Sequence, residues 1–128
     1  MHRDLFSWDL WRQRFVCAFR GVRCACTREK NFVVHGLAAV LVLIAAGLLG
    51  VSIFEWCVLF LCIGVVLAAE MFNTSLELLA RQVHPQPAPL IGQALDIAAG
   101  AVLICSITAA LVGASLLGTR LWAIYSAH

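Results

Sequence analysis

Three long apolar stretches alternate with short polar segments along the chain. They cover residues 32–51, 56–80 and 97–117, and the third contains no charged residue. A helix that crosses a bilayer needs about twenty mostly apolar residues, and each stretch reaches that length. Lipid offers no hydrogen bonds to backbone groups, so a helix is the form expected for each stretch. The pattern predicts an all-α membrane protein with three transmembrane helices.

The segment before the first apolar stretch, residues 1–30, has a different pattern. Large apolar side chains recur at three- and four-residue intervals, with arginines between them: Trp8, Trp11, Phe15, Phe19 and Val22 alternate with Arg12, Arg14, Arg20 and Arg23. This pattern favours an amphipathic helix that lies on an anionic membrane surface. The alternative is a basic, partly disordered anchor that only sets the orientation of the chain.

Composition supports the membrane assignment, and the distribution of charge orients the chain. Of its 128 residues, 62% are hydrophobic and 12% are charged, whereas soluble domains are about one quarter charged. Most of the nine Lys and Arg residues precede the first apolar stretch, and Arg81 follows the second. The positive-inside rule therefore places the N-terminus and an irregular, proline-containing loop at 81–95 in the cytoplasm. A turn at 52–55 and the C-terminus then face outward, although Arg120 contradicts the rule there. A chain of this length is expected to form one domain, 1–128.

Residues 70–77, EMFNTSLE, interrupt the second apolar stretch with charge. On a helix, Glu70, Asn73 and Glu77 fall within about 60° of one another and form one polar stripe. Ionisable residues inside a membrane span mark functional sites by default. The alternative is that the stripe joins helices by hydrogen bonds, a role that would suit Asn73 better than two like-charged carboxylates. The stripe therefore favours a functional site.

A divalent metal with its phosphates would neutralise these carboxylates. Mg²⁺ usually takes one or two protein carboxylates and keeps phosphates and water as further ligands. Glu29 and Glu77 are expected at a similar depth near the cytoplasmic face, and Glu70 lies about 10 Å deeper along the helix. A deeper carboxylate beside a shallow metal suggests a base that acts on a lipid hydroxyl. Asp96 directly precedes the third apolar stretch. It is expected either at the same depth as Glu29 and Glu77, near the metal, or as an ordinary helix N-cap.

The chain resembles the bacterial integral-membrane diacylglycerol kinase and undecaprenol kinase family. The resemblance covers about residues 15–115 and rests on FRGVR at 19–23, EKNF at 29–32 followed by His35, EMFNTSLE at 70–77 and DIAAGAVL at 96–103. It implies three transmembrane helices with an N-terminal surface helix, assembled as a homotrimer in the bacterial inner membrane. It also implies Mg²⁺-dependent transfer of the ATP γ-phosphate to a membrane lipid alcohol. No nucleic-acid partner is expected.

The resemblance assigns a role to each matching residue. Glu70 corresponds to the general base, and Asn73 to a polar residue of the catalytic site. Glu29 and Glu77 correspond to the carboxylates that hold Mg²⁺ and so position ATP. Asp96 corresponds to a residue of the nucleotide site, and Arg23 to a cation near lipid or phosphate.

Two positions depart from the family pattern. The family usually has a lysine before the aspartate of the third span, which would contact ATP phosphates, and Leu95 stands there. The family usually has an aspartate where this chain has Arg81, four residues after Glu77. Arg81 could pair with Glu77 on the helix or supply the missing phosphate contact. Two hypotheses follow: an active lipid kinase with an altered phosphate site, or a non-catalytic protein that binds lipid or nucleotide on the same scaffold.

Overall fold

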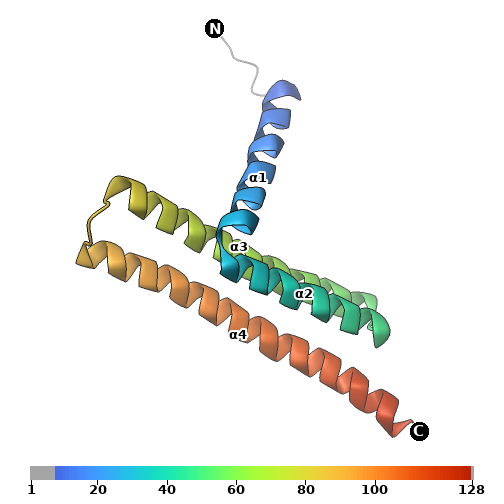
Figure 1. Cartoon of the computed structure of the whole chain (residues 1–128). Coiled ribbons are helices and arrows are strands. Elements are labelled where there is room, and N and C mark those ends of the chain that lie inside the picture. Colours follow the sequence, from blue (N-terminus) through green and yellow to red (C-terminus); the bar gives the residue numbers. More distant parts are fainter. Residues whose placement is uncertain (1–7, 128) are drawn as a thin grey trace.

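The computed structural model describes residues 8–127 and folds them into four helices (Figure 1). These are α1 (Trp8–Arg28), α2 (Lys30–Leu48), α3 (Ile53–Val83) and α4 (Pro89–Ser126). The helices α2, α3 and α4 are long and apolar enough to cross a membrane. They run alongside one another, and α1 leaves them at a steep angle (Figure 1). The prediction of an all-α membrane protein with three spanning helices is confirmed.

Helix α1 occupies most of the segment predicted to lie on the membrane surface. Its aromatic residues are exposed, Trp8 at 84% and Phe19 at 73%, so they are free to contact lipid. The helix ends at Arg28, and Glu29 takes an extended conformation before α2 begins. This break lets the axis of α1 point in a different direction from the axes of the three spanning helices. The membrane-surface location stays a prediction, and residues 1–7 lie outside the described residues.

The turn between α2 and α3 is stabilised by local hydrogen bonds at both helix ends. Gly50 takes a positive φ of 61° while its amide bonds to Gly47 and the Val51 amide bonds to Ala46, which completes a Schellman motif. Ser52 then begins α3 with a capping box, because its side chain and that of Glu55 bond to each other's backbone amides. The turn therefore occupies 49–52. The predicted position at 52–55 is wrong, because Ser52 already caps the next helix.

The connection between α3 and α4 is shorter than predicted. Only residues 84–88 are non-helical, so an irregular loop over 81–95 is wrong. Proline ends α3 but does not delay α4, since Pro89 occupies the first turn of that helix, where a missing amide hydrogen is tolerated. Asp96 consequently lies inside α4, and the N-cap alternative for Asp96 is also wrong because Ala88 is the N-cap. Both spanning helices extend beyond their apolar stretches here.

Apolar packing is densest at the end of the bundle that contains the 49–52 turn. Ala46, Val51 and Leu59 form a buried cluster there, and Leu59 is only 1% exposed. The partly buried side chains packed against this cluster are Val42, Trp56, Leu116 and Leu117. The same end carries an ion pair between Glu55 of α3 and Arg120 of α4. This end holds the three spanning helices together.

Candidate active site in the polar stripe of helix α3

The buried polar side chains of the described residues come from a single stretch of α3. They are Glu70, Asn73 and Thr74, which are 2%, 8% and 5% exposed. The periodicity that predicted one stripe also turns it inward, toward the neighbouring helices. A carboxylate removed from water is unfavourable unless it is paired or hydrogen-bonded. No hydrogen bond to the Glu70 side chain is present within residues 8–127.

Asn73 connects the deep and the shallow parts of the stripe. Its amide nitrogen donates a hydrogen bond of 3.0 Å to Oε1 of Glu77. Because a carboxylate only accepts, this contact fixes which way the amide faces. The carbonyl oxygen of Asn73 is therefore turned the other way, and it is buried without a hydrogen-bond partner within the described residues. A buried acceptor of this kind calls for a partner: a hydroxyl or water that donates a hydrogen bond, or a metal ion that the oxygen coordinates.

Glu77 lies one helical turn beyond Asn73 and is half-buried. Its second oxygen accepts a hydrogen bond of 3.1 Å from Nη2 of Arg81, four residues further along the helix. The Arg81 side chain is 70% exposed, whereas that of Glu77 is 28% exposed. The pairing expected from the four-residue spacing is therefore present. Glu77 is held between a buried amide and an exposed cation.

Two groups from the start of α2 lie near the stripe. Glu29, at the break between α1 and α2, and His35, one turn into α2, both interact electrostatically with Glu70, as does Glu77. The Glu29 side chain makes no capping hydrogen bond, so its oxygens are not committed to the helix end. Glu70, Asn73 and Glu77 thus share one face of α3, and Glu29 is close enough to act electrostatically on Glu70, while the roles assigned to these residues stay predictions.

The remaining predicted residues are placed differently. Asp96 is exposed on the second turn of α4, and Arg23 is exposed on α1. Among the residues that the structure describes, neither side chain has a hydrogen bond or ion pair to the stripe. Leu95, next to Asp96, lines a hollow of about 580 Å³ beneath the 84–88 loop, and Arg81 lines the same hollow. The two departures from the family pattern therefore face one space.

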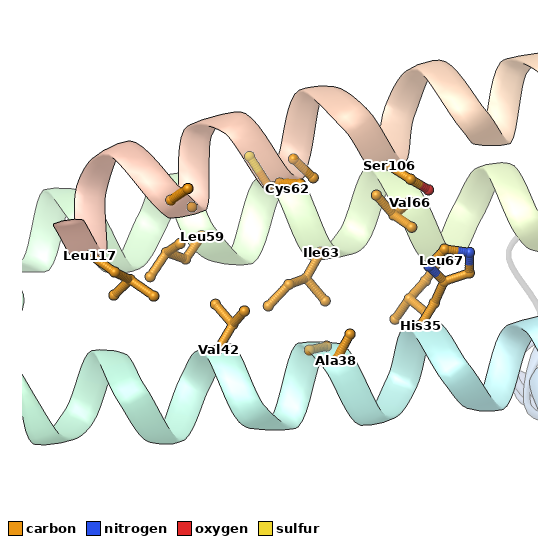
Figure 2. A pocket seen from close by; sticks show the side chains of 15 residues that line it. His35, Ala38, Val42, Leu59, Cys62, Ile63, Val66, Leu67, Ser106 and Leu117 are labelled. Carbon is orange, nitrogen blue, oxygen red and sulfur yellow. The ribbon is translucent and has the colours of Figure 1, made fainter.

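Sequence reasoning missed an apolar cavity of about 420 Å³ between α2, α3 and α4 (Figure 2). His35 and Ser106 lie near one end of this cavity, and Leu117 lies near the other (Figure 2). Val66 and Leu67 line it one turn before Glu70, so the cavity leads toward the buried carboxylate. Most residues of its α4 wall are small: Ser106, Ala109, Ala110, Gly113 and Ala114. That cluster is the sequence signal, but a cavity appears only once three helices meet.

Glu29 and Glu77 are the side chains that would hold a magnesium ion, and this role stays a prediction. Within residues 8–127 no three His, Cys, Asp or Glu side chains gather as a metal centre. Two carboxylates, Glu29 and Glu77, are what Mg²⁺ takes from a protein when phosphates and water complete its shell. Uncommitted oxygens at Glu29 and a weak surface pair at Glu77 leave both able to serve. The donor set suits a metal that arrives with a phosphate-bearing substrate.

Comparisons with known proteins identify the family of this chain. The profile of the prokaryotic diacylglycerol kinase family matches residues 16–117. An undecaprenol kinase of Bacillus subtilis (strain 168) is 37% identical over 99 residues, which cover 77% of this chain and 80% of that protein. A diacylglycerol kinase of Synechocystis sp. is 37% identical over 107 residues, or 80% of this chain and 59% of that longer protein. The chain belongs to the prokaryotic diacylglycerol kinase family, a family of membrane lipid kinases.

Proposed function

We propose that the protein transfers the γ-phosphate of ATP to the hydroxyl of diacylglycerol or undecaprenol at the cytoplasmic face of the bacterial inner membrane. The observation that supports this best is Glu70, a carboxylate that is 2% exposed and lies beside the unpaired carbonyl of Asn73. A buried base and a buried acceptor suit a hydroxyl group that must be oriented and deprotonated. A purely structural stripe would satisfy both groups internally.

Glu70 acts as the general base in this proposal. Its carboxylate accepts the proton of the lipid hydroxyl as the hydroxyl oxygen attacks the γ-phosphorus and ADP leaves. The Asn73 carbonyl accepts a hydrogen bond from the same substrate or from a water beside it, which orients the nucleophile. The apolar cavity that begins one turn before Glu70 holds the first part of the lipid chain. Its lining suits a hydrocarbon chain because it is almost wholly apolar, with His35 and Ser106 as the main polar exceptions.

Glu29 and Glu77 would hold Mg²⁺, which would neutralise charge on the ATP phosphates. Glu77 is kept in place by Asn73, so the metal-binding carboxylate and the catalytic stripe share one hydrogen bond of 3.0 Å. Asp96 and Arg23 complete the nucleotide and phosphate contacts. Both are exposed in one chain, which is consistent with sites that are completed between the protomers of a homotrimer.

The Arg81–Glu77 ion pair favours a second candidate. An arginine on a metal-binding carboxylate repels the metal, so the chain would bind lipid or nucleotide without catalysis. Assay in mixed micelles with Mg²⁺-ATP and a panel of lipid alcohols separates the candidates. Phosphorylation of a lipid alcohol that disappears in Glu70→Gln is the expected result, with exposed Ser75→Ala on the same helix as the matched control. Finding no Glu70-dependent phosphorylation of any lipid would support the non-catalytic candidate.

A further inference from the structure

Arg81 is the only residue carrying a full positive charge among those that line the hollow beneath the 84–88 loop. The walls come from the last turns of α3, the loop and the first turns of α4. Three prolines, Pro85, Pro87 and Pro89, stiffen the loop side, and Leu95 forms part of the α4 wall. The volume of about 580 Å³ is typical of small-ligand pockets, which span about 300–1,000 Å³. The hollow therefore combines adequate size with a single strong charge.

The present partner of Arg81 holds it weakly. The arginine side chain is 70% exposed, and exposed pairs of this spacing contribute little to stability. Only Nη2 of the guanidinium is engaged, by one Glu77 oxygen at 3.1 Å. Arginine presents five N–H donors, so the unused ones remain for an anion in the hollow. A phosphate group would bind this guanidinium through two parallel hydrogen bonds, which is stronger than the single contact to Glu77.

We propose that Arg81 exchanges partners during nucleotide binding: it leaves Glu77 and binds the polyphosphate of ATP in the hollow beneath the 84–88 loop. This inference deepens the proposed function and rests on it. The exchange answers the objection that Arg81 blocks the metal site. Glu77 keeps its hydrogen bond to Asn73, loses the competing cation and gains a free oxygen for the metal that accompanies the phosphates.

The loop supports a nucleotide rather than a lipid headgroup as the source of phosphate. The hollow is formed by residues 80–95, beyond the deep part of α3 that carries Glu70. His84 adds a polar group to its wall and donates through Nδ1 to the Gln86 carbonyl at 2.7 Å, since a carbonyl only accepts. Arg81 lines the hollow and pairs with Glu77, so phosphates bound in the hollow would lie close to the carboxylate proposed to hold the metal.

The test measures binding of Mg²⁺ and a non-hydrolysable ATP analogue to the full chain in neutral detergent micelles, which contain no lipid phosphate. We expect Arg81→Gln to weaken analogue binding about 10- to 100-fold, the effect of losing a charge-assisted contact. Arg12→Gln, which removes an exposed cation of α1, is the matched control and should bind as the wild type does. Arg81→Gln combined with Leu95→Lys returns a cation to the opposite wall and should recover part of the affinity.

Exchange has a second signature that a merely structural role lacks. Without nucleotide, Arg81→Gln should bind Mn²⁺, a spectroscopic probe of the divalent site, more tightly than the wild type, because Glu77 has lost its competitor. Unchanged analogue binding, or unchanged Mn²⁺ binding, in Arg81→Gln would overturn the exchange while leaving lipid kinase activity intact. Arg81-dependent analogue binding without phosphorylation of any lipid would support the exchange and refute the kinase. A wild-type chain that binds no nucleotide would refute both.

Discussion

Two regions of the helical bundle differ in whether their polar side chains have hydrogen-bond partners. At the end with the 49–52 turn, Glu55 accepts hydrogen bonds from Ser52 and from Arg120, both oxygens are occupied, and the apolar cluster of Leu59 packs beside them. At the other end, Glu70 is buried without a hydrogen bond and Asn73 keeps an unpaired carbonyl. Satisfied groups stabilise a fold, and unsatisfied ones are retained where a substrate supplies the missing partner. We therefore call the region of the 49–52 turn, Glu55 and Arg120 the stabilising end, and the region of Glu70, Asn73 and Glu77, where catalysis is proposed, the acting end.

The sharpest test of this contrast is Glu70→Gln, which keeps the shape of the side chain and removes the base. General acid–base catalysis contributes about 10²–10⁴-fold, so we expect kcat to fall by at least about 100-fold. Thermal stability should hold or rise, because a buried carboxylate is replaced by a neutral amide. Lipid phosphorylation and the unfolding midpoint in detergent measure the two effects. A variant that loses activity only because it unfolds would remove the distinction between the two ends.

Asn73→Leu tests the unpaired acceptor directly. The substitution removes the buried carbonyl and fills a similar volume, so the unfolding midpoint should be unchanged or higher. Activity should fall by about tenfold or more, because the nucleophile loses an orienting contact worth about 1–3 kcal/mol and Glu77 loses its buried hydrogen bond. Asn73→Asp, which keeps an acceptor but not the donor, separates these two losses. Equal activity in Asn73→Leu and the wild type would assign the residue to packing.

The sequence predicts more of the acting end than of the stabilising end. Helical periodicity alone placed Glu70, Asn73 and Glu77 on one face, and four-residue spacing paired Glu77 with Arg81. Both connections were misjudged, because apolarity cannot reveal that Gly50 takes a positive φ or that Pro89 begins a helix. Arg120, which violated the charge rule, pairs with a residue 65 positions away. Local patterns predict faces and spacings, whereas such pairs and cavities depend on how helices meet.

The stabilising end is tested by two glycines, Gly50 in the 49–52 turn and Gly47 at the end of α2. Gly50→Ala places a side chain on a residue with φ of 61°, which costs about 1–2 kcal/mol of folding free energy. Gly47→Ala, in the last turns of α2, should be neutral or stabilising by up to about 1 kcal/mol. Apart from the adjoining backbone, neither new methyl group meets an atom within 4 Å, so backbone conformation separates the two variants. Unfolding in detergent measures the difference, and activity per folded molecule should be retained in both.

The smallest change in stability is expected on removal of the Glu55–Arg120 pair, and single and double variants together measure its contribution. Glu55→Gln preserves the capping box, since glutamine serves equally at that position, and removes only the charge that Arg120 binds. Arg120→Gln removes the other partner. Each single variant should lower the unfolding midpoint slightly, and the double variant should be no less stable than either, because the two side chains contribute one shared interaction. The change in kcat should be negligible in all three, since Glu55 lies fifteen residues before Glu70 on α3, a separation of about 22 Å. An ion pair whose loss reduced catalysis as Glu70→Gln does would mean that the ends are coupled through α3, and the division between a stabilising and an acting end would have to be abandoned.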